Sequence, residues 1–101
     1  MYRVDISDRA NYEPDKILTY ISEDLAAPQA AVSFVDGVYA CYDRLEENPY
    51  IYEACRDTRL SRKGYRRAVI KNYVMLYKIY DHDLVAVHHF FYSGQDYAMM
   101  V

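Results

Sequence analysis

Residues 62 to 97 restrict the fold more than any other part of the chain, because they contain three strand-like segments joined by very short turns. Aromatic and β-branched side chains, which suit a half-buried pleated surface, dominate this stretch, RKGYRRAVIKNYVMLYKIYDHDLVAVHHFFYSGQDY. Turns are expected only around Lys71-Asn72 and at Asp81-His82-Asp83. Connections this short cannot carry a parallel crossover, so the sequence predicts an antiparallel meander of three strands.

The beginning of the chain predicts one more strand and a helix. Tyr2–Ile6 alternates apolar and polar residues, as a half-exposed strand does, and this strand can pair with the later sheet. Ser7 or Asp8 then offers an N-cap side chain to a helix that ends near Ala26. Because proline cannot donate a backbone hydrogen bond, we expect the regular part of this helix to begin within a few residues of Pro14, behind a loose start.

A second helix is predicted from Gln29 to Glu47, where apolar residues recur every three or four positions. Gly37 weakens it, and a close approach to the first helix would explain a glycine there. Asn48-Pro49 ends the helix, since the residue before a proline is pushed out of the helical region. Residues 50 to 61 have no clean period, and we expect an irregular crossing with one helical turn.

These elements define an α+β fold: an N-terminal strand, a helical hairpin, then a three-stranded antiparallel meander, with the helices packed on one face of the sheet. With 101 residues, the chain is expected to form a single domain over residues 1–101. No window approaches the roughly 20 apolar residues of a membrane helix, and no signal-peptide pattern is seen, so a cytoplasmic protein without membrane contact is expected. Cys41 and Cys55 have no close-spaced partners and are expected to be reduced thiols.

Charge is distributed very unevenly along the chain. The net charge of −3 argues against a protein that coats nucleic acid indiscriminately. Residues 1–55 nevertheless carry −7, residues 56–72 carry +6 and residues 73–101 carry −2. Nearly all the positive charge therefore lies just before and within the first strand of the meander.

Short motifs in this order and spacing resemble the RelE/ParE superfamily of toxins from bacterial type II toxin–antitoxin systems, which includes plasmid stabilisation proteins. The resemblance runs over nearly the whole chain, through Val4-Asp5-Ile6-Ser7, Tyr20-Ile21, Pro28 with Ala30-Ala31 and Phe34, Leu45 with Asn48-Pro49, Gly64-Tyr65-Arg66-Arg67, Asn72-Tyr73, Tyr77-Lys78-Ile79 and Asp96-Tyr97. It implies a small toxin that inhibits growth and is neutralised by a cognate antitoxin encoded beside it.

Two activities occur on this fold, so the resemblance alone does not choose between them. RelE-like members cut mRNA in the ribosomal A site without a metal or other cofactor, whereas ParE-like members inhibit DNA gyrase. The implied partners are the antitoxin and either the ribosome with mRNA or gyrase, with operator DNA bound only through the antitoxin.

The resemblance and the chemistry of RNA cleavage together nominate site residues. Cleavage by the adjacent 2′-hydroxyl needs a proton acceptor, cations and a proton donor. Candidates for these roles are Arg66, Arg67, Lys71, His89, Tyr92 and Tyr97, and candidates for target binding are Arg59, Arg62, Lys63 and Tyr65. Successive strand residues point to opposite faces, so only one arginine of the pair can face the groove beside the sheet, and Arg67 is favoured.

The same alternation predicts that His88 and His89 lie on opposite faces of one strand, so at most one of them serves the groove. His82, between Asp81 and Asp83 in a turn, is expected to be solvated rather than bound to a metal.

Three positions depart from the pattern of active nucleases in the superfamily. Many members have Tyr-Arg where this chain has Tyr73-Val74, and two basic residues where it has Gly94 and Gln95. Neither valine nor glutamine replaces the permanent charge of a guanidinium. We therefore expect a toxin that binds a large target, with a ribosome-dependent mRNA endonuclease and a decayed, non-toxic homologue as alternatives. An acidic segment of the antitoxin is expected to cover residues 56–72.

Overall fold

The computed structural model describes residues 1–101, and the order of elements agrees with the order predicted from the sequence. The strands are β1 (Arg3–Ile6), β2 (Arg66–Ile70), β3 (Tyr73–Tyr80) and β4 (Leu84–Tyr92). The α-helices are α1 (Asp8–Thr19), α2 (Pro28–Glu47) and α3 (Thr58–Arg62). A π-helical turn, η1 (Tyr20–Asp24), follows α1, and two 3₁₀ turns are η2 (Pro49–Ile51) and η3 (Tyr97–Met100).

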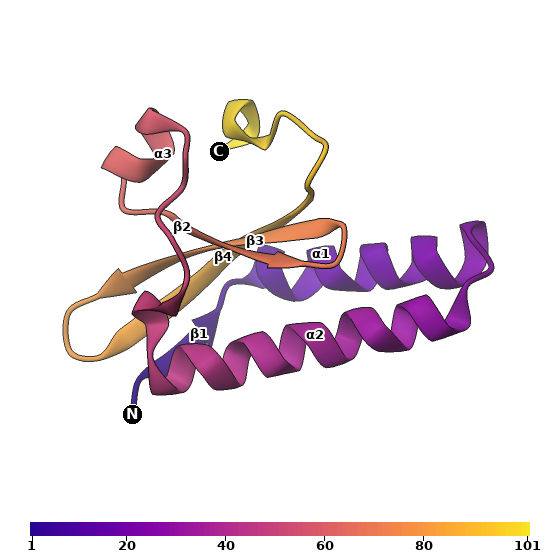
Figure 1. The fold of residues 1–101 in the computed structure, drawn as a ribbon, viewed down its shortest axis with the longest axis horizontal. Helices are drawn as coiled ribbons and strands as arrows, with labels where there is room; N and C mark the ends of the chain where they lie inside the picture. Colours follow the sequence, from indigo (N-terminus) through magenta and orange to yellow (C-terminus); the bar gives the residue numbers. More distant parts are fainter.

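The four strands form one sheet in the order β1-β4-β3-β2 (Figure 1). The pairs β2–β3 and β3–β4 are antiparallel, as the short turns required, while β1 pairs with β4 in the parallel sense. The N-terminal strand thus joins the meander on the side of its last strand. The α+β fold with a mainly antiparallel, open sheet is confirmed.

The first helix begins earlier than the position of Pro14 suggested. Its regular part starts at Asp8, so the expectation of a loose start behind the proline was wrong. Ser7 caps the helix, because its Oγ accepts a hydrogen bond from the backbone N–H of Ala10 at 3.1 Å. Pro14 lies inside the helix, which continues through η1.

The second helix runs for 20 residues, and Asn48 ends it as predicted. Gly37 lies on the side of α2 that faces the sheet: a Cβ atom there would meet Cγ2 of Ile70 on β2 at 2.8 Å. The close approach is therefore to the sheet, whereas the sequence had suggested an approach to the first helix. After α2 the chain crosses to the opposite side of the sheet through η2 and α3.

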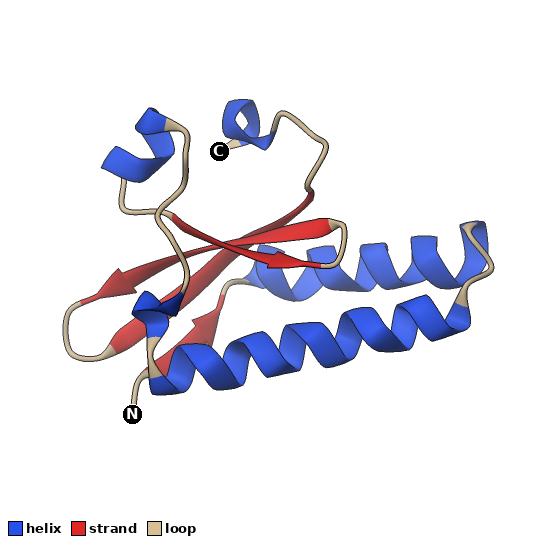
Figure 2. Ribbon diagram, in the orientation of Figure 1, coloured by secondary structure: helices blue, strands red, loops and turns tan.

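The sheet separates two layers of helices (Figure 2). α1 and α2 cover one face over a cluster of 13 buried residues, which includes Phe34, Leu45 and Tyr77. α3 and η3 lie over the other face, called here the α3 face, on a smaller cluster formed by Cys55, Leu60, Tyr65, Val74, Leu76 and Phe91. Cys41 and Cys55 are free, buried thiols that belong to different clusters.

Candidate functional site

The two arginines of the Gly-Tyr-Arg-Arg motif point to opposite faces of the sheet. In β2, Arg66 pairs with Tyr77 of β3, whose side chain belongs to the large core, and Arg67 pairs with Leu76, which belongs to the α3 face. The alternation expected from the sequence is therefore present, and Arg67 is the arginine on the α3 face.

Arg66 braces the chain that follows α2. Its Nε atom donates to the backbone carbonyl of Tyr52 at 3.1 Å, and its Nη2 atom donates to the same carbonyl and to that of Tyr50 at 3.4 Å. The guanidinium also lies 5.5 Å from the centre of the Tyr50 ring. These contacts engage the Nε and Nη2 donors of Arg66 within the protein, so the residue has a structural role at η2.

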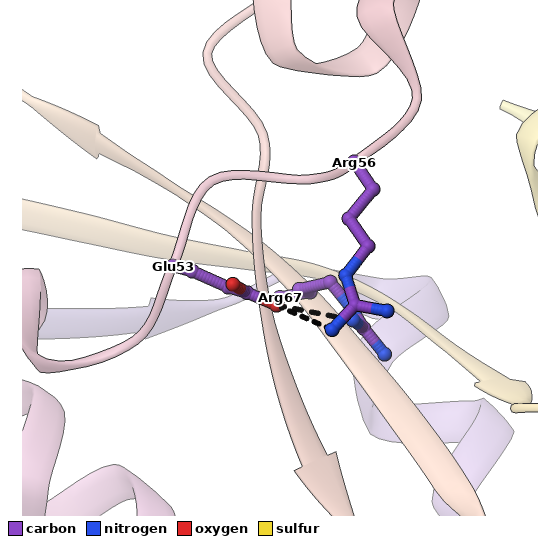
Figure 3. Close-up of polar contacts among 3 residues, drawn as sticks. All are labelled: Glu53, Arg56 and Arg67. Carbon is purple, nitrogen blue, oxygen red and sulfur yellow. Dashed lines mark hydrogen bonds and ion pairs between the residues drawn. The ribbon is translucent and has the colours of Figure 1, made fainter.

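Arg67 is largely buried and is held by a carboxylate. Its Nη1 atom lies 3.2 Å from Oε1 of Glu53, and Arg56 reaches the same oxygen with its Nη2 atom at 3.4 Å, as Figure 3 shows. The side chain of Arg67 is only 15% exposed, and its Nε atom is buried without a hydrogen-bond partner. Glu53 thus neutralises part of the positive charge that the sequence placed here, and the sequence reasoning did not single it out.

Both histidines of β4 lie on the α3 face, so the prediction that they occupy opposite faces was wrong. The register shifts within β4: Leu76 pairs with His89 and Tyr77 pairs with Val87, which leaves His88 as the extra residue of a β-bulge. The ring of Tyr65 lies 5.7 Å from that of His88 and 6.3 Å from that of His89. No residue pattern in the sequence indicated this bulge.

The surroundings of the two histidines favour their neutral forms. Burial, followed by the charges of Arg9 and His88, lowers the pKa of His89 to about 4, and burial with the nearby Lys78 lowers the pKa of His88. Nε2 of His88 is 3.1 Å from the hydroxyl of Tyr80, whereas Nδ1 of His89 is buried without a partner. Both rings therefore serve as uncharged aromatic groups at neutral pH.

Lys78 belongs to the same surface, although the sequence reasoning passed over it. Its Nζ atom lies 4.3 Å from the centre of the Tyr65 ring, a cation–π distance. The alternation of side chains in β3 could have predicted this position. Lys78 is two residues after Leu76 and two before Tyr80, and all three share one face of the strand.

Aromatic stacking joins the histidines to the C-terminal turn. The ring of Phe91 stacks on His89 at 5.3 Å and on Tyr97 at 5.6 Å. Arg59 of α3 holds η3 from the other side, because it donates to the carbonyls of Ala98 and Val101. The predicted site residue Tyr97 therefore lies on the α3 face, and Arg59 is committed to a backbone contact.

Four other predicted site residues take no part in these contacts. Lys71 is exposed in the β2–β3 turn, where its φ angle is 56°. Tyr92 lies beside α1, with its ring 6.0 Å from that of Tyr73. Arg62 and Lys63 are exposed at the end of α3. His82, which was expected to be solvated and was not a site candidate, is exposed in the β3–β4 turn.

The three departures from the nuclease pattern have different structural consequences. Val74 is fully buried in the α3-face cluster, where a charged side chain would lose its hydration without a partner. Gln95 accepts a hydrogen bond from the backbone N–H of Tyr92 at 2.9 Å. A Cβ atom at Gly94 would meet the Tyr92 ring at 2.5 Å, so a larger residue there requires that ring to move.

The site on the α3 face combines aromatic rings with a few cations. Its members are Tyr65, Arg67, Lys78, Tyr80, His88, His89, Phe91 and Tyr97. Aromatic and arginine side chains are the residues that most often carry binding energy at protein interfaces. Such a surface can recognise a protein, and its neutral histidines can also accept a proton.

The sequence model of a known family, described as ParE toxin of type II toxin-antitoxin system, parDE, matches residues 4–97. The chain belongs to this family. It is therefore the toxin of a type II toxin–antitoxin system, and a cognate antitoxin is its partner. The match includes β1, both long helices and the whole α3 face up to Tyr97.

A search of curated proteins gave no match to this toxin. None of its helices is both long and apolar enough to cross a membrane.

Proposed function

We propose that this toxin inhibits growth by binding a protein target through the α3 face, without cleaving RNA, and that the target is DNA gyrase, which ParE-like toxins inhibit. The observation that carries the proposal is the separation of the candidate catalytic residues. Arg66 and Tyr92 lie away from the α3 face and Lys71 lies in a hairpin turn, so only Arg67, His89 and Tyr97 share that face.

The charges that remain on the α3 face are weak support for phosphodiester chemistry. Cleavage requires cations free to stabilise negative charge that develops on the phosphate. Arg67 is already paired with Glu53, and lowered pKa values keep both histidines uncharged near pH 7. A binding surface does not require free cations, because aromatic side chains and an arginine that is already ion-paired can contribute binding energy at an interface.

The proposal is tested by expressing the toxin without its antitoxin and measuring two activities. Purified toxin should inhibit supercoiling by gyrase, and primer extension on cellular mRNA should show no new cleavage sites. Cleavage at defined positions in ribosome-bound mRNA, with normal supercoiling, would overturn the proposal.

Single substitutions connect the activity to the α3 face. Lys78→Ala and Tyr97→Ala are expected to reduce gyrase inhibition at least tenfold, because each removes a partly exposed group at the proposed interface. Arg3→Ala is the matched control, since Arg3 is an exposed cation on β1 that pairs with Asp5. Equal effects of all three substitutions would show that the α3 face is not the interface.

One arrangement favours an mRNA endonuclease as the second candidate. Arg67, Leu76 and His89 form one row across three strands, and Tyr97 reaches that row through Phe91. A neutral histidine can accept the proton of a 2′-hydroxyl. If the toxin is such an endonuclease, it leaves supercoiling by gyrase unchanged, and His89→Gln abolishes its cleavage of mRNA.

Unimpaired growth at high soluble expression would instead favour the decayed homologue.

The antitoxin is proposed to place an acidic segment over residues 56–72. Arg62 at the end of α3, Lys63 directly after it and Arg56 just before the helix are exposed cations there, beside the ion-paired Arg67. Attraction between opposite charges then contributes to neutralisation of the toxin and weakens with salt. Co-purification that survives Arg62→Glu/Lys63→Glu, which changes only exposed cations, would count against this contact.

A further inference from the structure

Glu53 and Arg67 are joined twice, once through the backbone and once through their side chains. The backbone N–H of Arg67 donates to the carbonyl of Glu53 at 3.0 Å. The next residue, Ala54, forms an antiparallel bridge with Arg66, so this short segment lies along the outer edge of β2. The backbone bond keeps Glu53 beside Arg67 whether or not the two side chains are in contact.

The side-chain contact satisfies neither partner fully. It joins a single nitrogen of Arg67, Nη1, to a single oxygen of Glu53, Oε1, at 3.2 Å, and Arg56 approaches that same oxygen (Figure 3). Arginine and carboxylate groups form their strongest pairs through two parallel hydrogen bonds. Nε of Arg67, which could supply a second bond, is buried without a partner, and an unpaired buried donor is unfavourable. The charge of Arg67 is thus neutralised while its hydrogen-bonding capacity is left partly unused.

The two partners differ greatly in their exposure to water. The side chain of Arg67 is 15% exposed, whereas that of Glu53 is 57% exposed. A buried cation needs an anion beside it, because pairing must offset the loss of its hydration. The next carboxylate along the chain, Asp57, is engaged as the N-cap of α3, where it accepts from the N–H of Leu60 at 3.0 Å. Glu53 therefore supplies the anion, and it can return to water when another anion takes its place.

The surroundings of Arg67 favour the approach of a negatively charged group. Arg56, Arg62 and Lys63 are exposed nearby, and Lys78 lies on the same face of the sheet. Burial lowers the pKa of both histidines of β4, so these rings add no positive charge near pH 7. Arg67 released from Glu53 would carry one positive charge, which matches one carboxylate of a protein.

We propose that Arg67 anchors the target protein through two parallel hydrogen bonds to one of its Asp or Glu carboxylates, and that Glu53 is a placeholder which this carboxylate displaces. The inference rests on the proposed function, because it takes the partner of the α3 face to be a protein. The exchange is confined to side chains, since the backbone bond to Arg67 holds Glu53 in position. Because the internal ion pair must break before the target is bound, Glu53 moderates the potency of the toxin.

Glu53→Gln tests the displacement, since glutamine retains the length of the side chain but cannot compete with the target for Arg67 as an anion. The concentration of purified toxin that half-inhibits supercoiling by gyrase should fall about two- to fivefold, as expected from the removal of one partly exposed ion pair. Loss of structure cannot imitate this result, because a less stable toxin is less potent. Unchanged or lower potency of folded Glu53→Gln toxin would overturn the placeholder.

Asp5→Asn is the matched control for the loss of a negative charge. Asp5 is 54% exposed and pairs with Arg3 at 3.3 Å, so its exposure and its ion pair resemble those of Glu53, but it lies on β1. Potency of this variant should equal that of the unmodified toxin. An equal gain in both variants would reveal a general effect of net charge and would overturn the proposal.

Arg67→Lys tests the two parallel bonds and does not depend on how Glu53→Gln folds. Lysine can reproduce the single contact with Glu53, but its ammonium group lacks the planar fork that a two-bonded carboxylate requires. The thermal unfolding temperature should stay near that of the unmodified toxin, while potency falls about tenfold through the loss of one charged hydrogen bond. Full potency would show that Arg67 serves only to pair with Glu53, which would overturn the anchor.

Growth inhibition at matched soluble expression separates this inference from the identity of the target. If the unmodified toxin leaves supercoiling unchanged, gyrase is not the target, and the potencies are then ranked by growth. Glu53→Gln should remain the most potent protein and Arg67→Lys the least, with no cleavage of mRNA. The same ranking accompanied by cleavage at defined positions in mRNA would overturn the protein carboxylate, because the displacing anion would then be a phosphate.

Discussion

The two faces of the sheet differ in how completely they are covered. Beneath α1 and α2, 13 buried residues form the large core, and none of the buried residues in the protein is polar or charged. On the α3 face, the buried cluster has 6 residues and is bordered by Arg67, Lys78 and the two histidines. The first face supplies most of the stability, and the second leaves aromatic and charged groups available for recognition.

Helix length explains this difference. α2 has 20 residues and presents a long apolar stripe to the sheet, whereas α3 has 5 residues and covers little beyond Leu60. The remaining rows of the α3 face are therefore only half covered. A chain of this size can afford one large core, and its second face is where side chains with other roles can be placed.

The largest expected effect is in the core beneath the helices. Phe34→Ala should reduce the free energy of unfolding by about 3–5 kcal/mol, because it leaves a cavity where a ring packs against Tyr73. Urea denaturation followed by circular dichroism measures the change. A loss below about 1 kcal/mol would mean that the core beneath α1 and α2 does not supply most of the stability.

A smaller effect is expected for Leu60→Ala, the corresponding change under α3. Leu60 is as fully buried as Phe34, yet a five-residue helix can settle into the space, so we expect a loss of about 2–3 kcal/mol. The same denaturation experiment applies. If Leu60→Ala costs more than Phe34→Ala, the α3 face is a principal core and not a secondary one.

The neighbouring arginines provide a direct comparison across the sheet. Arg66→Gln should cost about 1–2 kcal/mol of stability, because carbonyls of Tyr50 and Tyr52 lose a charged donor, and it should leave growth inhibition unchanged in cells that express it as folded protein. Arg67→Gln should instead change stability little and reduce growth inhibition. Thermal unfolding and a growth assay measure the two properties, and equal patterns for both variants would contradict the separation of roles.

The smallest effect concerns pH. The pKa of His89 falls from 6.5 in an unfolded chain to about 4 in the folded protein, so between these values only the unfolded chain binds the proton. Stability should therefore decline as the pH falls from about 6.5 to about 4. After allowance for solvent screening the contribution is on the order of 1 kcal/mol.

His89→Gln should reduce this acid-induced decline relative to the unmodified toxin, as measured by urea midpoints at pH 7 and pH 5. Comparison of the two proteins isolates His89, because Glu13, whose raised pKa contributes to stability with the opposite sign, is present in both of them. An identical decline in the two proteins would show that His89 is accessible to protons in the folded state.

Local patterns were sufficient for most of the fold. The turns at Lys71-Asn72 and Asp81-His82-Asp83, and the stop at Asn48-Pro49, depend on residues adjacent in the chain, and all three were predicted. Pro14 misled because the cap that starts its helix, Ser7, acts seven residues earlier. Gly37 misled because periodicity does not identify which neighbour comes close.

The candidate site was less predictable, since its residues meet only through the sheet. The alternation of Arg66 and Arg67 followed from strand geometry, but Glu53, which pairs with Arg67, comes from an irregular segment 14 residues away. The β-bulge at His88 reverses the alternation that separated the two histidines. Glu13 reaches Phe90 across 77 positions, a contact that no local pattern encodes.

By itself the sequence determined the order of elements, the antiparallel meander and the family, because each depends on short-range propensity or on the identity and spacing of residues. Only the tertiary structure decided which face carries Arg67, that both histidines share it, and that the end of β4 is capped by side chains. These features arise from register and from contacts between distant segments. One residue of shift in a strand moves every following side chain to the opposite face, and a shift of this kind is invisible in a linear sequence.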